Sequence, residues 1–187
     1  HWGMGTELTG PVSAEGKAEW PKNKIWNVHG IYHVELKYAN GVTVIVDDKN
    51  PNGVRFEGDK GWIFVSRGAV RATASDPIAP GKELKALDAS DEKLLKEPLG
   101  KDAVRLPVSG DHYKNWLDAV VAGTQPIAPA EVGHRSCSSC LVAWAAMKVG
   151  KKVVWDPKKE AIVGDADLAR WTSRPYRAGW KLPAVRA

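Results

Sequence analysis

Apolar and polar residues alternate along much of the first third of the chain. Between residues 12 and 20 every second residue is small or apolar. A longer run places Val34 and Leu36 on one face and His33 and Glu35 on the other. A period of two residues is typical of a strand that buries one face. The pattern therefore predicts a half-buried sheet in this part of the chain.

Turn-forming sequences separate the predicted strands. Asn40-Gly41 is the strongest signal, because Asn and Gly accept the positive φ of a type I′ hairpin turn. Asn52-Gly53 and Asp59-Lys60-Gly61 predict two more turns. Trp62–Ser66 starts with four apolar residues in a row, which predicts cover on both faces, by helices on one side and by a second subunit on the other. With a short strand at Ala69–Ala74, these signals predict an antiparallel meander of five or six strands.

An irregular stretch follows the predicted meander. Residues 75–110 show little periodicity, and Lys82–Lys96 is the single short helix expected there. A clearer helix begins with Ser109 or Asp111 as its N-cap and ends at Gly123.

The last third of the chain predicts two more helices. The longest runs from about Ala130 to Val149, with Gly150 at its C-terminal cap, and Asp165 opens a short one. Strands followed by helices are typical of an α+β protein, here a large open, mainly antiparallel β-sheet with helices packed on one face. A length of 187 residues predicts a single domain over residues 1–187.

Charge and hydropathy narrow the classes of partner. Lys and Arg number 27 and Asp and Glu 22, which gives a net charge of +5. The basic residues are scattered and form no stripe interleaved with aromatic residues, so we expect no nucleic-acid partner. No apolar run approaches the roughly 18 residues that span a bilayer, so we expect no membrane insertion.

Tryptophan is unusually common, with nine Trp against two Phe and four Tyr. The indole combines a large apolar face with an N–H donor, which suits cores, interfaces and sugar-stacking sites alike. Trp116, Trp144 and Trp171 fall on predicted helices and are expected in the core. The Trp residues that flank turns or termini are better candidates for a site or an interface: Trp2, Trp20, Trp26 and Trp180.

The histidines and cysteines suggest sites without defining one. His134, Cys137 and Cys140 are three residues apart, a spacing that permits a metal site or a redox pair. We expect the cysteines instead to act as small apolar residues that pack the long helix on the sheet. His29 and His33 share the polar strand face with Glu35 and are candidate ligand contacts.

The same face of the sheet is the expected oligomer interface. Its aliphatic side chains lie on the side away from the helices, and an apolar patch of that kind usually marks a contact surface. The residues placed on this face are His29, Ile31, His33, Thr43, Ile45, Ile63 and Val65.

The chain lacks the motifs that hold a dinucleotide or a common catalytic group. It contains no Gly-x-Gly-x-x-Gly, Walker loop, Gly-x-Ser-x-Gly or His-Glu-x-x-His sequence. We therefore expect no catalytic, cofactor-binding or metal-binding residue, and no binding of NAD(P)H by this chain alone.

Several short segments, read in order, indicate a family. They are Trp2-Gly3-Met4-Gly5 with Thr9-Gly10-Pro11-Val12, Tyr38-Ala39-Asn40-Gly41-Val42, Arg55-Phe56-Glu57-Gly58 with Gly61-Trp62-Ile63-Phe64-Val65-Ser66-Arg67-Gly68, Gly133-His134-Arg135-Ser136, Trp155-Asp156-Pro157, Gly164-Asp165, and Arg174-Pro175-Tyr176-Arg177 with Trp180. In this order and spacing the chain resembles the C-terminal domain of Gfo/Idh/MocA oxidoreductases, in the branch common among bacterial dehydrogenase-like proteins of carbohydrate catabolism.

The resemblance implies a two-domain enzyme. An N-terminal Rossmann domain would bind NAD or NADP and carry a Glu-Lys-Pro motif, and the C-terminal domain would shape the sugar pocket and form oligomer contacts. The family's catalytic Asp and His usually precede the Trp-Gly-Met-Gly segment by a few residues, and His1 does not occupy that His position. No catalytic residue is therefore carried over, and the chain is expected to be part of a longer protein.

On this interpretation the chain is the substrate-binding and oligomerisation domain of an NAD(P)-dependent sugar oxidoreductase. The expected sugar contacts are His134, Arg135, His29, His33 and Trp2. The alternative is a stand-alone, non-catalytic module that binds a carbohydrate or a protein. The compartment, bacterial cytoplasm or periplasm, the sugar, and the choice of NAD or NADP are left open by the sequence.

Overall fold

The computed structural model describes residues 1–22, 25–67 and 85–181. The chain divides into two compact units, one formed by His1–Val46 with Ser109–Ala187 and the other by Asp47–Val108. Helices and antiparallel sheets are both present, which confirms the predicted α+β class.

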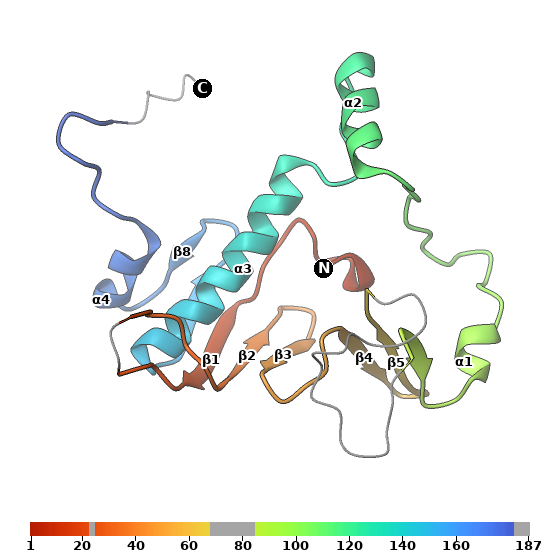
Figure 1. Cartoon of the computed structure of the whole chain (residues 1–187), viewed down its shortest axis with the longest axis horizontal. Helices are drawn as coiled ribbons and strands as arrows, with labels where there is room; N and C mark the ends of the chain where they lie inside the picture. Colours follow the sequence, from red (N-terminus) through yellow and green to blue (C-terminus); the bar gives the residue numbers. More distant parts are fainter. Residues whose placement is uncertain (23–24, 68–84, 182–187) are drawn as a thin grey trace. The chain divides into compact units, whose positions relative to one another are not determined.

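The first unit is built on a five-stranded sheet in the order β3-β2-β1-β7-β8 (Figure 1). Its strands are β1 (Ser13–Ala18), β2 (Tyr32–Lys37), β3 (Thr43–Asp47), β7 (Val153–Asp156) and β8 (Ala161–Ile162). The central strand β1 pairs antiparallel with β2, with Gly16 opposite Val34. The late strand β7 pairs with the other side of β1, so the sheet joins the two ends of the sequence.

The helix α3 (Ala130–Val149) packs on this sheet (Figure 1). It ends at Gly150, whose φ of 64° is the left-handed geometry that Gly favours at a helix C-terminus. These bounds are those that the sequence predicts. The core between helix and sheet consists of Ala14, Val34, Leu36, Tyr38, Val142, Ala143, Ala146, Met147, Val153, Trp155 and Leu168.

The alternation along β2 is confirmed, and the turn after it is corrected. Val34 and Leu36 are buried, whereas His33 is exposed and Glu35 half-buried. A type I′ turn needs positive φ at both Asn40 and Gly41, but here only Gly41 has it, at 86°. The Asn40 side chain instead accepts a hydrogen bond from the backbone N–H of Val42.

Two further helical segments follow the caps that the sequence indicates. In α2 (His112–Ala122) the Asp111 carboxylate accepts hydrogen bonds from two backbone N–H groups, and Gly123 ends the helix at a φ of 64°. Asp165 caps α4 (Ala166–Ala169), which continues as the 3-10 helix η2 (Arg170–Thr172).

The apolar stripe of α2 is not in a core. Trp116 is 57% exposed, and Leu117, Val120 and Val121 are exposed as well. Ala119 is the one residue of α2 that is buried among those described. The expectation that Trp116 belongs to the core is therefore wrong.

The second unit contains a separate three-stranded sheet. Its order is β4-β5-β6, with β4 (Val54–Gly58), β5 (Gly61–Val65) and β6 (Leu87–Ala89), followed by the short helix α1 (Lys93–Lys96). Part of the stretch predicted as helix, Lys82–Lys96, is thus a strand. The strand predicted at Ala69–Ala74 lies outside the described residues.

This division corrects the expected single meander. Ile31 and Ile45 lie in or beside the first sheet, whereas Ile63 and Val65 lie in the second. The residues expected to form one oligomer face therefore do not belong to one sheet. Within β5, Phe64 is buried and Val65 is exposed, so the described part of this unit covers one face of the strand better than the other.

Candidate functional site

A pocket of about 430 Å³ lies between the start of the chain and the start of α3. We call it the Trp2 pocket, and it is lined by His1, Trp2, Gly3, Ala128, Val132, Gly133 and Ser136. Trp2 belongs to the 3-10 helix η1 (Trp2–Met4), which ends at Gly5 with a φ of 62°. A short helix closed by a left-handed Gly thus places Trp2 at a pocket that the first turns of α3 also line.

A buried polar cluster adjoins this pocket. His1 Nε2 lies 3.0 Å from the Tyr38 hydroxyl and 3.4 Å from Ser139 Oγ. The Ser139 hydroxyl donates to the backbone carbonyl of Arg135, one turn earlier in α3. Burial raises the pKa of the Tyr38 phenol, so this hydroxyl stays protonated through the neutral range. His1 Nδ1 is buried and has no hydrogen-bond partner within the described residues.

His134 and Arg135 lie on α3 but point to a different place. His134 Nε2 is 2.7 Å from Glu160 Oε1, and Arg135 Nη1 is 3.1 Å from the same oxygen. Arg135 also donates to Glu131 at 2.7 Å and to the backbone carbonyl of Pro157. The Arg135 side chain is only 17% exposed. The two residues therefore fasten α3 to the β7–β8 turn, and we call this arrangement the Glu160 clamp.

The turn that carries Glu160 is shaped by its neighbours. The Asp156 carboxylate accepts hydrogen bonds from the backbone N–H groups of Lys158 and Lys159. The hydrogen bond from the Lys159 N–H is the largest cause of the lowered pKa of Asp156; desolvation opposes it, and the Lys158 N–H and the two lysine charges add to the lowering. Glu160 has a φ of 52°, a left-handed conformation that is strained for a residue with a side chain. The clamp is one reason for this residue to hold such a conformation.

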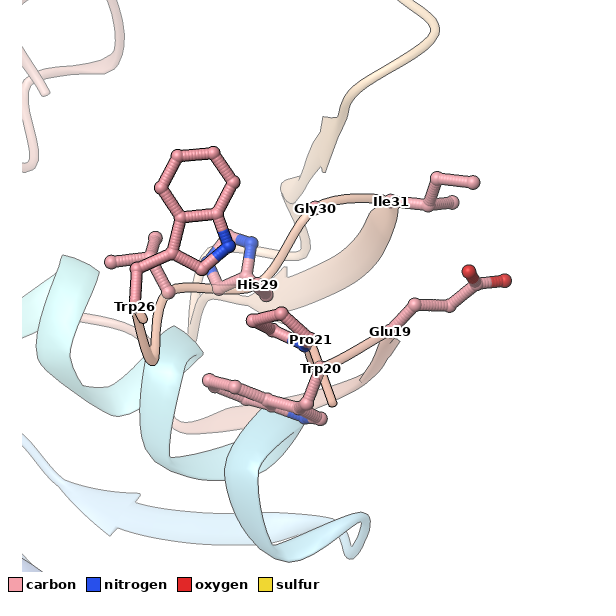
Figure 2. Close-up of a pocket in the computed structure, with 8 residues that line it drawn as sticks. Glu19, Trp20, Pro21, Trp26, His29, Gly30 and Ile31 are labelled. Carbon is pink, nitrogen blue, oxygen red and sulfur yellow. The ribbon is translucent and has the colours of Figure 1, made fainter. Parts of the chain in front are cut away.

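His29 and His33 lie elsewhere on the first unit. His33 Nε2 is 3.5 Å from Glu35 Oε1, on an exposed part of β2. His29 packs edge-on against Trp20 and Tyr32, with ring centroids 5.6 and 4.7 Å away. It lines a second pocket, of about 510 Å³, which we call the Trp26 pocket (Figure 2). That pocket is lined by Glu19, Trp20, Pro21, Trp26, Val28, His29, Gly30 and Ile31.

The five predicted sugar contacts are thus not gathered in one site. Trp2 lines one pocket and His29 another, while His134 and Arg135 form the clamp and His33 lies on a strand face. Tyr38 and Ser139, which border the Trp2 pocket, are absent from the sequence prediction. Tyr38 carried a usable signal, because it continues the buried face of β2 and is polar at its tip.

The cysteines lie on the outer side of α3. Cys137 and Cys140 are both free and exposed. The expectation that they pack the helix on the sheet is wrong, because Ser139, Val142, Ala143 and Ala146 occupy the buried side. Within the described ranges, no group of three or more His, Cys, Asp or Glu side chains is placed to hold a metal ion.

Comparison with known proteins adds no relative. No protein-family model matches the chain, and no curated protein matches it. In the part of the chain that the structure describes, no helix combines the length and apolar character needed to cross a membrane.

Proposed function

We propose that the chain is the substrate-binding and oligomerisation domain of an NAD(P)-dependent sugar oxidoreductase of the Gfo/Idh/MocA type. The observation that supports this proposal is the meeting of distant segments at the Trp2 pocket. Trp2 and Gly3 line the pocket together with Gly133 and Ser136, and His1 bonds Tyr38 at its border. These residues come from three of the segments on which the family resemblance rests, or directly adjoin them.

A fourth segment adjoins the same region. Ser139, which borders the pocket, lies beside Gly10, and Gly10 lies against Trp155 and Pro157; each of the three is close enough to contact a Cβ built on Gly10. Segments separated by more than a hundred residues are thus packed around one place in the first unit. Such convergence is what a pocket maintained for a ligand would need, and it favours the Trp2 pocket as the sugar site.

The described residues do not fit a dinucleotide. Pyrophosphate binding uses the free N–H groups and positive dipole at a helix N-terminus. In α2 those N–H groups are taken by the Asp111 carboxylate, whose negative charge would repel phosphate, and α3 carries the acidic Glu131 in its first turn, which disfavours phosphate in the same way. We therefore assign NAD or NADP to another domain of the same protein and derive no cofactor step here.

The chain's own contribution is to bind and orient the sugar. The Trp2 indole supplies an apolar wall for a sugar face, and the Ser136 hydroxyl, which donates to the Val132 carbonyl, supplies a hydrogen-bond acceptor from α3. The neutral Tyr38 hydroxyl and Ser139 fix the His1 ring at the border. Holding the substrate in a defined orientation is the part of catalysis that a substrate domain can provide.

The test compares the protein encoded by the whole reading frame with residues 1–187. NADH fluorescence titration should show binding by the first and none by the second. In the whole protein, Trp2→Ala should raise KM for the sugar, whereas Trp180→Ala should not, because Trp180 is exposed and does not line the pocket. A whole protein that binds no nicotinamide cofactor would overturn the enzyme proposal and leave the stand-alone binding module.

A further inference from the structure

We propose that Cys137 and Cys140 form a two-coordinate site for a soft monovalent cation of the Cu(I) type on the outer side of α3. Each thiol loses its proton on binding, and both sulfurs ligate the same ion. The products are one bis-thiolate complex and two released protons, and no atom changes its oxidation state. The inference rests on described residues of α3 and holds for an enzyme domain and for a stand-alone module alike.

The two cysteines are free and exposed on one helix. Free cysteine is among the most buried residue types when it only fills space, because its side chain behaves as a small apolar group. On α3 that packing role belongs to buried residues such as Ser139 and Ala143. Packing therefore accounts for neither thiol, and both are open to a ligand that arrives from solvent.

The helix holds the two side chains at a defined separation. Residues three apart on an α-helix are neighbours on its surface, with Cβ atoms about 5–6 Å apart. A disulfide needs Cβ atoms about 3.5–4.5 Å apart, so α3 would have to distort to form one. Metal–thiolate bonds of about 2.3 Å let a bridging ion hold two sulfurs up to about 4.6 Å apart. The spacing therefore favours a bridging ion over a disulfide.

The donors select the class of ion. Two thiolates suit a soft ion of low coordination number, such as Cu(I), whereas hard cations prefer oxygen ligands. A structural zinc ion needs four ligands, and the described residues place no three His, Cys, Asp or Glu side chains around one point. His134 lies one turn before Cys137, but its Nε2 is already 2.7 Å from Glu160 Oε1. The thiol pair is therefore the whole ligand set on this part of α3.

The thiol pair lies one helical turn beyond the lining of the Trp2 pocket. Gly133 and Ser136 line that pocket, and Cys137 and Cys140 each follow one of them by four residues. Residues four apart lie on the same side of a helix. A bound ion would therefore lie on the side of α3 that borders the pocket.

The test is titration of reduced residues 1–187 with Cu(I) under argon, with bicinchoninate as the competing chelator. The chain contains two cysteines in all, so no other thiol contributes. We expect one copper ion per chain, and we expect Cys137→Ser and Cys140→Ser each to weaken binding at least about a hundredfold. His134→Ala is the control, because its imidazole is bonded to Glu160, and it should bind copper as wild type does.

A further variant tests the helical spacing. Cys140→Ser combined with Ser138→Cys keeps two thiols but makes them neighbours in the sequence, and adjacent residues do not face each other on a helix. This variant should bind Cu(I) at least about tenfold more weakly than wild type. Circular dichroism of each variant establishes that the helices are still formed.

Four results would overturn the proposal. The first is the absence of stoichiometric copper, and the second is wild-type affinity in either single Ser variant. The third is wild-type affinity in the variant with adjacent thiols, which would show that the helix contributes nothing. The fourth is one copper ion per two chains with a dimer in sedimentation, which would make the ion a bridge between copies. Because this assay needs neither sugar nor nicotinamide cofactor, its failure is distinct from a failure of the proposed oxidoreductase function.

Discussion

Replacing Arg135 by Ala separates a structural role of this residue from a role in sugar binding. The side chain is 17% exposed and makes three contacts, to Glu131, to Glu160 and to the backbone carbonyl of Pro157. The Glu131 side chain is 54% exposed, so water screens its ion pair with Arg135, and the pair contributes a few tenths of a kcal/mol at most. The bond to the Pro157 carbonyl is charge-assisted and largely shielded, so it dominates.

We expect Arg135→Ala to lower the free energy of unfolding by about 2 kcal/mol. With a urea dependence of about 2 kcal/mol per molar, the unfolding midpoint should fall by about 1 M. Arg135→Lys keeps the charge but loses the fork that reaches several oxygens, and it should recover only part of the loss. His134→Ala is the comparison, since it removes one exposed hydrogen bond to Glu160 and should cost about 0.5 kcal/mol.

The assay is urea unfolding followed by circular dichroism, in parallel with sugar binding to the folded variants. The clamp predicts reduced stability with sugar affinity unchanged for Arg135→Ala. Wild-type stability together with lost sugar affinity would refute the clamp and restore Arg135 as a substrate contact.

Three further predictions concern other parts of the first unit. The Tyr38 phenol has a higher pKa in the folded chain than in the unfolded chain. Its stabilising effect is complete below the ordinary tyrosine pKa and is lost as pH rises through the pKa of the folded state. The free energy of unfolding should therefore fall above about pH 10, and it should fall less in Tyr38→Phe. Cys137 and Cys140 should both react with a thiol reagent in the folded chain, and the double Ala variant should unfold within about 0.5 kcal/mol of wild type; slow reaction of either thiol would contradict their exposure. Gly16→Ala should destabilise the sheet by about 1–3 kcal/mol, because its new Cβ would lie 2.6 Å from the His33 carbonyl oxygen. Gly100→Ala is the control, because its Cβ meets open space, and it should be neutral. Equal free energies of unfolding for the two variants would show that β1 and β2 are not this close.

Local signals in the sequence predicted the helices of the first unit well. Asp111, Gly123, Gly150 and Asp165 are caps in the structure at the positions that the sequence indicates. A cap is decided by the residue itself and its nearest neighbours in the chain. Predictions of this kind therefore need no knowledge of tertiary structure.

Sheet partnership was not predictable in the same way. Alternation predicted β2 and a continuous apolar run predicted β5, but nothing in either strand indicates which sheet it joins. Pairing of β7 with β1 depends on contacts between residues some 140 positions apart, for example Ser13 with Val154. Three-residue strands such as β6 are also too short to show a period.

The candidate sites show the same limit. Small residues lie on both sides of α3, so composition alone could not say that Cys137 faces outward and Ser139 inward. Glu160 carries no sequence signal, because its role depends on the approach of α3 to the β7–β8 turn. Trp2 and Trp26, which the sequence marks as candidates for a site or an interface, each line a pocket; Trp2 lies in η1 near the start of the chain, and Trp26 lies outside the described strands and helices.

The most direct test of the central proposal is hydride transfer by the protein encoded by the whole reading frame. The measurement is reduction of NAD⁺ and NADP⁺ at 340 nm with a panel of pyranose sugars, for wild type and for Trp2→Ala. We expect at least one sugar to be oxidised by wild type, with an increased KM in the Trp2→Ala variant. Absence of turnover with every sugar, together with absence of nicotinamide binding, would contradict the assignment of this chain to an oxidoreductase.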